Sequence, residues 1–275
     1  MNKKNIGVFD SGYGGLTVLK DIRKLLPEYD YIYLGDNARA PYGTRSFEVV
    51  YQFTLQAVKK LFELDCELVI LACNTASAKA LRTIQQKDLP KISPDKRVLG
   101  VIRPTAEQIG KFTSSGVVGV LGTKGTVNSN SYVIEIHKQY PHLKTVQKAC
   151  PLWVPLIENN LHFSDGGQLL IHDDLKSLLQ LHPEMDTVLL ACTHYPVVKD
   201  YLEHLVQGKI QFVAQGEIVA RSLKDYLRRH QQMDARLSKN NTIQFLTTDG
   251  VEEFNQFASQ FIGEHIYAEQ VQIDT

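Results

Sequence analysis

Short apolar runs alternate along the chain with longer amphipathic stretches, and this alternation constrains the fold more than any other feature. The runs are rich in Val, Ile, Leu and Tyr, and most of them lack polar residues at every second position. Such runs are typical of strands buried on both faces of a parallel sheet. We expect strands at 6–10, 31–34, 68–72, 98–102, 117–121, 188–191, 211–213 and 242–246. Between them we expect helices at 16–26, 46–64, 75–86, 104–112, 126–139 and 197–206. Strand, helix and strand in repetition predict an α/β fold with right-handed crossovers.

Two different strand-end motifs recur in the same order. Residues 6–12 (IGVFDSG) resemble 118–124 (VGVLGTK), and residues 68–75 (LVILACNT) resemble 187–194 (TVLLACTH), at nearly the same separation. This internal repeat predicts two similar parallel-sheet lobes that are related by a pseudo-two-fold axis and separated by a cleft. Charged and proline-rich residues at 87–97, and the region 207–209, are the expected crossings. We therefore expect one lobe from 1–97 plus 210–275 and the other from 98–209.

Composition excludes several classes of protein. The 275 residues are 43% hydrophobic and 22% charged, which is ordinary for a globular domain and argues against disorder. Lys and Arg number 30, as do Asp and Glu, so no nucleic-acid or membrane partner is expected from charge. No apolar run reaches the roughly 18 residues of a membrane helix, and the N-terminus does not resemble a signal peptide. We expect a cytoplasmic protein whose four cysteines are thiols.

The glycine-rich segment at 10–15 (DSGYGG) lies between an expected strand and an expected helix. It lacks the third glycine of the dinucleotide fingerprint G-x-G-x-x-G. Asp36, at the end of the next strand, suits a ribose-binding acid, but Asp10 and Ser11 occupy the strand tip where a pyrophosphate would lie. NAD binding is therefore weakly supported, and a tight turn that lets the helix pack closely is the simpler interpretation.

Cys73 and Cys192 each follow a buried strand and precede polar residues and a helix start. A buried cysteine is commonly just a small apolar side chain, and that interpretation suits Cys66 and Cys150. At a helix N-terminus, however, a thiol pKa falls from about 8.5 toward neutrality. With one such thiol in each lobe, the two are expected to face each other across the cleft.

Four kinds of chemistry could use these two thiols. Zinc could bind Cys73, Cys192 and His194, although the spacing is not typical of a metal site. His194 could activate a cysteine nucleophile, which would leave the second cysteine without a role. A redox pair requires that the two sulfurs approach closely. Racemisation, by contrast, needs two acid/base groups on opposite faces of one carbon atom, and the repeat favours it.

Five segments together are specific enough to identify a family resemblance. They are 7–16 (GVFDSGYGGL), 35–43 (GDNARAPYG), 72–77 (ACNTAS), 149–158 (ACPLWVPLIE) and 192–196 (CTHYP). The chain resembles the cofactor-independent aspartate/glutamate racemase superfamily, and within it the glutamate racemases, over roughly residues 5–262. The resemblance implies two α/β lobes with the active site between them, and interconversion of L- and D-glutamate for peptidoglycan. It implies no cofactor and no metal, and it leaves a homodimer open. The alternative is a relative that acts on another diacid, as an aspartate racemase or a decarboxylase.

The resemblance also implies residue roles. Cys73 would take the α-proton from D-glutamate, with help from Asp10. Cys192 would take it from L-glutamate, with help from His194 and Glu158. The implied substrate-binding residues are Asp10, Ser11, Pro41, Tyr42, Gly43, Asn74, Thr75, Thr123, Thr126, Thr193 and His194. Hydroxyl residues at such positions also cap helices, and both functions use helix N-termini.

A few residues depart from the usual pattern of these enzymes. They are Trp153, Gly125, Ala191, Ala214 and the pair Asp249-Gly250. None of them removes an implied acid/base group. We therefore expect them to affect the rate, the shape of the side pocket or regulation rather than the type of reaction.

Overall fold

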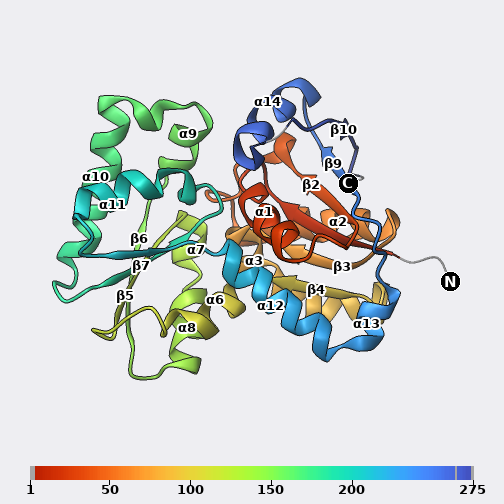
Figure 1. Cartoon of the computed structure of the whole chain (residues 1–275), viewed down its shortest axis with the longest axis horizontal. Coiled ribbons are helices and arrows are strands. Elements are labelled where there is room, and N and C mark those ends of the chain that lie inside the picture. Colours follow the sequence, from red (N-terminus) through yellow and green to blue (C-terminus); the bar gives the residue numbers. More distant parts are fainter. Residues whose placement is uncertain (1–3, 264, 274–275) are drawn as a thin grey trace.

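The computed structural model describes residues 4–263 and 265–273, and this part of the chain forms two parallel sheets in two lobes (Figure 1). The larger sheet has the order β10-β9-β2-β1-β3-β4 and the smaller one β6-β5-β7-β8. The strands of the first are β1 (Asn5–Asp10), β2 (Tyr31–Gly35), β3 (Cys66–Leu71), β4 (Arg97–Gly100), β9 (Ile243–Thr247) and β10 (Ala268–Gln270). Those of the second are β5 (Val117–Gly122), β6 (Lys144–Ala149), β7 (Thr187–Ala191) and β8 (Gln211–Val213). The predicted α/β fold with two lobes is confirmed.

The order of four strands is the same in both lobes. The run β2-β1-β3-β4 corresponds to β6-β5-β7-β8, so the strands that carry the sequence repeat occupy equivalent places. Gly7 of β1 lies opposite Val69 of β3, and Gly119 of β5 lies opposite Val188 of β7. Because parallel strands end at the same sheet edge, the residues after β1 and β3 meet in one lobe and those after β5 and β7 in the other. This order supports the predicted pseudo-two-fold relation.

Helices cover both faces of each sheet, which makes each lobe three layers. One face of the larger sheet carries α1 (Leu16–Leu25), α12 (Gly216–Arg229), α13 (Gln231–Arg236) and α14 (Val251–Ile262). The other face carries α2 (Phe47–Glu63), α3 (Asn74–Lys79), α4 (Leu81–Thr83), the π-helical turn η2 (Ile84–Asp88) and α5 (Leu89–Ile92). In the smaller lobe, α6 (Ile102–Ile109) and α8 (Ser131–Gln139) pack on one face, and α9 (Trp153–Glu158), α10 (Asp165–Gln180) and α11 (Lys199–Val206) on the other. The remaining elements are α7 (Lys124–Asn128) and the 3₁₀ turns η1 (Asn37–Arg39), η3 (Leu161–Phe163) and η4 (Tyr195–Val198).

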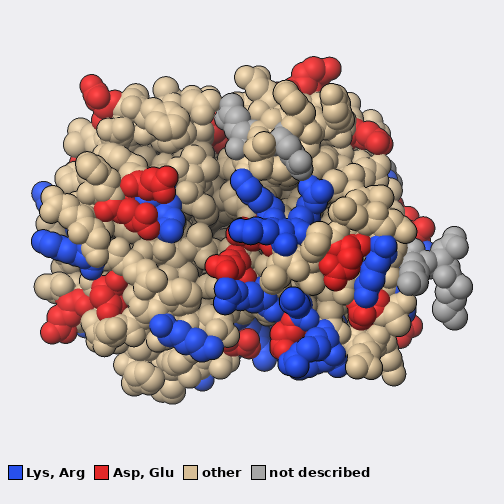
Figure 2. Space-filling view, viewed as in Figure 1, with Lys and Arg blue, Asp and Glu red and all other residues tan. Residues whose placement is uncertain are grey.

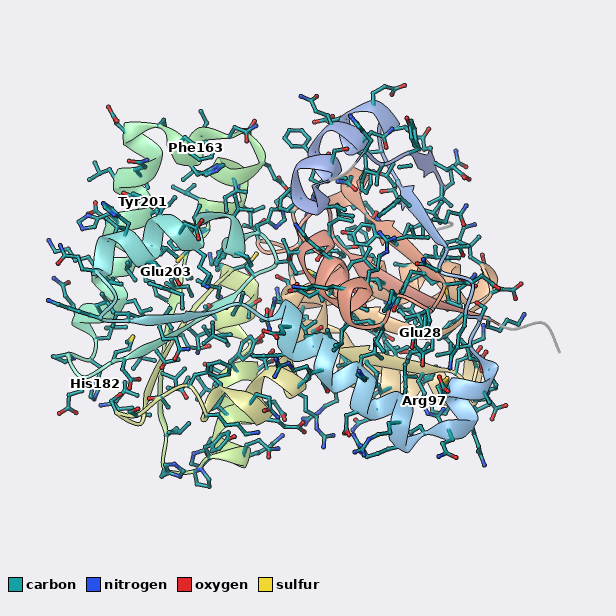
Figure 3. The ribbon with its side chains drawn as sticks, in the orientation of Figure 1. Glu28, Arg97, Phe163, His182, Tyr201 and Glu203 are labelled. Carbon is teal, nitrogen blue, oxygen red and sulfur yellow. The ribbon has the colours of Figure 1, made fainter. Side chains whose placement is uncertain are left out.

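The strand pairing corrects both expected lobe boundaries. β4 pairs with β3, so residues 98–100 belong to the sheet of the first lobe, although residues from 98 onward were expected in the second. Figure 3 shows Arg97, at the start of β4, in the first lobe. β8 pairs with β7, so 211–213 belongs to the second lobe's sheet rather than the first. In each lobe the chain therefore completes its fourth strand before it crosses. The charged segment before β4 is not a linker, because it contains the helix α5, whose Leu89 is buried.

Two strands were not predicted, and two expected helices are divided. β6 (KTVQKA) and β10 (AEQ) lie at sheet edges, where a strand needs no continuous apolar run, so their sequences carry little strand pattern. The expected helix at 126–139 is split into α7 and α8, with Asn130 between them at φ 53°. The expected helix at 75–86 becomes α3, α4 and the start of η2.

Basic side chains gather over α1 and α12 on the face that Figure 2 shows, with acidic side chains among them. Several of these charges are paired within α12: Arg221 bonds Glu217, and Arg228 and Arg229 both bond Asp225. This patch is thus partly neutralised by its own helix. Within the described residues, no helix is both long and apolar enough to span a bilayer.

Candidate active site

A pocket lies between the lobes at the carboxyl ends of the strands, and it contains both Cys73 and Cys192. The lining residues are Ser11, Gly12, Ala40, Pro41, Tyr42, Gly43, Thr44, Cys73, Asn74, Thr75, Thr123, Lys124, Cys150, Pro151, Val154, Pro155, Glu158, Cys192, Thr193 and His194. The structure therefore brings together all the implied site residues except Asp10 and Thr126, which are fully buried next to this lining.

Cys73 lies on the side of the first lobe, between β3 and α3. Its sulfur accepts a hydrogen bond from the Ala76 backbone N–H at 3.5 Å, as an N-cap does, and its thiol donates to Ser11 Oγ at 3.5 Å. Burial, and secondarily the nearby Asp10 carboxyl group, raise the pKa of this thiol to about 12. Cys73 is therefore protonated at neutral pH.

The pKa of Cys73 contradicts the expectation that a helix N-terminus lowers it toward neutrality. The Ala76 N–H does favour the thiolate, but removal of the sulfur from water has the larger opposite effect. α3 has only six residues, so its dipole is also short. Cys192 is followed by the 3₁₀ turn η4 rather than by an α-helix, and an α-helix begins only at Lys199.

Cys192 lies on the side of the second lobe, after β7, and has a different partner. Its sulfur is 4.0 Å from Nδ1 of His194, and His194 Nε2 is 2.9 Å from Oε1 of Glu158 at the end of α9. Burial alone would lower the pKa of His194, but the hydrogen bonds and charges of Cys192 and Glu158 outweigh it and raise that pKa to about 10. His194 is thus an imidazolium at neutral pH, with one N–H directed to Glu158 and the other toward sulfur.

Asp10 lies beneath the pocket rather than in its wall. Its carboxylate accepts hydrogen bonds from the Gly12 backbone N–H at 3.1 Å and from Thr193 Oγ1 at 3.3 Å. Burial raises its pKa, although the nearby imidazolium of His194 acts in the opposite direction. Asp10 therefore connects the two lobes and influences Cys73 through its charge, because an ionised carboxyl group beside a thiol disfavours the thiolate.

Three threonines form a hydroxyl cluster where α3 of the first lobe meets α7 of the second. Thr75 Oγ1 lies 2.9 Å from Thr123 Oγ1 and 3.5 Å from Thr126 Oγ1, and Thr123 caps α7 by accepting from the Thr126 backbone N–H at 3.2 Å. Only Thr75 and Thr123 reach the pocket surface. Thr126 therefore supports the other two. Thr123 caps a helix and also lines the pocket, so capping does not prevent it from contacting a ligand.

The loop that contains Pro41, Tyr42 and Gly43 forms another wall, and the side chain of Tyr42 is bonded within the first lobe. Its hydroxyl donates to the buried carboxylate of Asp36, away from the pocket, and its ring packs between Phe9 and Phe53. Asp36 also accepts from Arg39 Nε at 2.7 Å, which holds the loop against the first lobe. Asp36 thus fixes this loop, rather than contacting a ribose as the dinucleotide interpretation required.

Several lining residues were not predicted from the sequence. They are Gly12, Ala40, Thr44, Lys124, Cys150, Pro151, Val154 and Pro155. Most lie inside the segments that carry the family resemblance, next to predicted site residues. Their position beside those residues is a signal from which they could have been predicted. Cys150 keeps its core interpretation, because burial raises its pKa far above the usual value and its thiol donates to the Lys148 carbonyl.

Two of the residues that depart from the usual pattern, Trp153 and Gly125, have structural explanations. Trp153 is fully buried, packs on Tyr195 and donates from Nε1 to Asp174 at 3.0 Å, so it shapes the core beneath the site and does not line the pocket. At Gly125 a Cβ would lie 3.0 Å from the Gly43 carbonyl oxygen and from Lys79 Nζ, so glycine allows α7 to approach the first lobe. In the described part of the chain, no group of three or more His, Cys, Asp or Glu is arranged to hold a metal ion.

The glycine-rich turn of the first lobe lies directly against the residues that follow Cys192. A Cβ at Gly14 would be 2.4 Å from His194 Nδ1 and 2.4 Å from Thr193 Oγ1. Real side chains do not tolerate such distances, so glycine is required by the close approach of the two lobes. Thr17 of α1 strengthens this contact by donating to the Thr193 carbonyl at 3.0 Å.

Comparisons with known proteins agree with this geometry. The family model described as Asp/Glu/Hydantoin racemase matches residues 6–223. A glutamate racemase of Geobacter metallireducens is 39% identical over 94% of this chain and 93% of its own. The crystal structure of a glutamate racemase isoform from Bacillus anthracis has a TM-score of 0.89 at 33% identity and covers 99% of both chains. That of a glutamate racemase from Francisella tularensis, in complex with D-glutamate, has a TM-score of 0.85 at 30% identity over 100% of this chain and 99% of that one.

Proposed function

The chain belongs to the Asp/Glu/hydantoin racemase family, and from this premise we propose that it interconverts L- and D-glutamate by acid/base catalysis with two thiols. The observation that carries the proposal is the position of Cys73 and Cys192 in one pocket, each contributed by an equivalent strand end of a different lobe. A racemase needs an acid and a base on opposite faces of the α-carbon, and the repeated fold supplies one thiol for each face.

The two thiols have different neighbours. Cys73 keeps its proton, because burial and Asp10 raise its pKa to about 12. His194 is an imidazolium beside Cys192, and an imidazolium N–H stabilises negative charge on a nearby sulfur. In the proposed mechanism, Cys73 acts as the proton donor and Cys192 as the proton acceptor when L-glutamate is bound.

With L-glutamate bound, the thiolate of Cys192 takes the α-proton and becomes a thiol, and the C–H electron pair moves into the α-carboxylate. Cys73 then donates its proton to the other face of the α-carbon and becomes a thiolate, so D-glutamate is released. The reverse reaction begins with Cys73 as the thiolate. Protons and electrons balance without an oxidant or a second reactant, and no step in this scheme uses a cofactor.

The difficult part of this reaction is the weak acidity of the α-hydrogen. The carbanion needs donors that are already aimed at the carboxylate when charge develops on it. The pocket offers the hydroxyls of Ser11 and Thr75 and the amide of Asn74, all held by the surrounding structure. The hydroxyls of Thr123 and Thr193 donate instead to Thr126 and Asp10. Lys124 lies at the same wall, and its charge is suited to a substrate with two carboxylates.

A solvent-isotope experiment tests the function. Purified protein incubated with L-glutamate in D₂O, without added cofactor, is expected to lose ellipticity toward zero and to place deuterium at the α-carbon of the recovered glutamate. The same result is expected from D-glutamate. A panel with aspartate and other diacids tests the alternative, a related enzyme for another diacid. No exchange with glutamate would reject the assignment, and faster exchange with another diacid would favour that alternative.

The bond between Glu158 and His194 predicts a change in pH dependence when Glu158 is replaced by glutamine. The pKa of His194 is raised, so its proton contributes stability fully below pH 6.5, and this contribution is lost as the pH rises through about 10. We expect kcat/KM of the wild type to fall above about pH 10, and this alkaline limb to move toward neutrality in Glu158→Gln. pH profiles measured with both enantiomers check this; an unmoved limb would contradict the role of Glu158.

The remaining expectations follow from the same assignment. D-glutamate produced in this way is a component that bacteria use in peptidoglycan, so we place the activity at the start of cell-wall synthesis, in the cytoplasm. The only partner that this chemistry needs is the small-molecule substrate. A homodimer remains a prediction; apolar side chains that a partner could cover are exposed in the second lobe, such as Phe163, which is 72% exposed near α9 and α10 (Figure 3).

A further inference from the structure

Four buried polar side chains form a hydrogen-bond network that joins the pocket to both crossings between the lobes. Asn74 belongs to α3 of the first lobe and lines the pocket, whereas Tyr132 belongs to α8 of the second lobe. Thr105 lies in α6, just after the first crossing, and Gln215 lies between β8 and α12, at the second. All four are at most 3% exposed. Buried polar groups of this kind fix a unique arrangement only when every member is paired.

The donor and acceptor of each bond in this network follow from Thr105, whose hydroxyl hydrogen is already used. Thr105 donates its hydroxyl hydrogen to the Val101 carbonyl at 2.7 Å, so its oxygen accepts from Gln215 Nε2 at 3.0 Å. The amide nitrogen of Gln215 therefore faces Thr105 and the hydroxyl of Tyr132, and its oxygen Oε1 accepts from Asn74 Nδ2 at 2.7 Å. Tyr132 completes the ring by donating to Asn74 Oδ1 at 2.6 Å.

This arrangement leaves Asn74 in only one orientation. Its oxygen is used by Tyr132 and one of its two amide hydrogens by Gln215, so the other amide hydrogen is available to the pocket. A reversed amide would place Oδ1 against Oε1 of Gln215 and Nδ2 against the donor of Tyr132, and would lose both bonds. The network therefore sets Asn74 as a hydrogen-bond donor.

We propose that Gln215 is a positioning residue that holds the Asn74 amide so that its free N–H binds a carboxylate of the substrate. This inference rests on the proposed function, because glutamate supplies the carboxylate. Gln215 is next to Ala214, one of the residues that depart from the usual pattern. Its side chain acts through Asn74 and does not line the pocket itself.

The location of Gln215 gives this role a second consequence. The network includes residues from both lobes and from the first turns after both crossings, so the orientation of Asn74 depends on how the lobes are placed. A movement that separates α3 from α8 would break the bond between Asn74 and Tyr132. The orientation of Asn74 therefore requires the two lobes to keep their present placement as well as the side chain of Gln215.

Replacement of Gln215 by leucine tests the proposal. The variant removes the acceptor for Asn74 and the donor for Thr105 and Tyr132, and it puts an apolar side chain of similar size in their place. We expect KM for both enantiomers to rise by about tenfold or more, since a hydrogen bond to a charged carboxylate contributes roughly that much to binding. The kcat is expected to change by a smaller factor, because neither thiol is touched. An unchanged KM would overturn the proposal.

A matched pair of threonine variants separates positioning from a loss of packing. Thr105 and Thr54 are both fully buried, and each donates to the carbonyl four residues earlier, at 2.7 and 2.6 Å. Only Thr105 also accepts from Gln215. Thr105→Val and Thr54→Val (in α2) are expected to lower thermal stability by similar amounts. Only Thr105→Val is expected to raise KM as well. Equal effects of the two variants on KM would contradict the proposal.

A double-mutant cycle distinguishes action through Asn74 from an independent effect. If Gln215 acts only through Asn74, the variant Asn74→Ala/Gln215→Leu is expected to have the same KM as Asn74→Ala alone. A KM that rises by the product of the two single-variant factors would overturn the proposal. Wild-type protein is measured in parallel. Absence of racemisation in the wild type would reject the proposed function itself. An active wild type in which the two substitutions affect KM independently would reject only the role of Gln215.

Discussion

Serine in place of either Cys73 or Cys192 is expected to lower the kcat for both enantiomers by about 10³-fold or more, with the fold intact. A serine hydroxyl is a far weaker acid than a thiol, so it neither gives nor takes the α-proton at a useful rate. Each variant loses turnover in both directions, because every turnover uses one thiol as base and the other as acid. Circular dichroism at a glutamate-sensitive wavelength measures the rate, and the far-ultraviolet spectrum reports the fold.

Cys66→Ser is the control for this pair. Cys66 is fully buried in the core between β3 and α2 and does not line the pocket, so its replacement is expected to reduce stability and leave the kcat close to that of the wild type. Full activity in Cys73→Ser or in Cys192→Ser would refute catalysis by two thiols. Activity that disappears in all three variants would point instead to a general loss of structure.

Alanine in place of Gly14 is expected to reduce kcat/KM by roughly a hundredfold, although the substitution adds a single methyl group. That methyl group would occupy the space of His194 Nδ1 and Thr193 Oγ1, each 2.4 Å away, and would displace the imidazolium from Cys192 or push the lobes apart. Steady-state kinetics with both enantiomers measures the loss. The alkaline limb of the pH profile is also expected to move, since His194 would no longer be held between Glu158 and Cys192.

Gly166→Ala provides the matched control for Gly14→Ala. A Cβ at Gly166, in the first turn of α10, would meet no atom within 4 Å, and alanine favours helices. We expect this variant to keep full activity and to gain slightly in stability. If Gly14→Ala were as active as Gly166→Ala, the close approach of the two lobes at His194 would not be required for catalysis.

The sequence alone predicted the strands that build the site better than two of the four edge strands, β6 and β10. β1, β3, β5 and β7 are buried on both faces, so their apolar runs are continuous and their places along the chain were predicted closely. β6 and β10 lie at edges and have mixed sequences that no periodicity distinguishes from loops. The lobe crossings were misplaced for a related reason. Charge and proline content suggested a linker before β4, whereas strand pairing, which depends on distant residues, decides to which sheet β4 and β8 belong.

Positions within the site were easier to predict than the electrostatics that acts on them. The motifs placed Cys73 and Cys192 in one pocket, yet the pKa of Cys73 is raised where a helix N-terminus suggested that it would fall. Burial is a property of the packed lobes and cannot be read from the residues next to a cysteine. The same holds for Tyr42, whose hydroxyl binds Asp36, and for Gln215, whose partners come from three separate helices.

The unequal surroundings of the two sulfurs, Asp10 near one and a His194–Glu158 pair near the other, have a thermodynamic consequence. Mirror-image substrates have the same free energy in water, so the equilibrium constant of the reaction is one. The quotient kcat/KM must then be identical in the two directions at every pH and in every variant. The two directions therefore differ in kcat by the same factor as they differ in KM, so the enantiomer that is turned over faster at saturation must also have the higher KM.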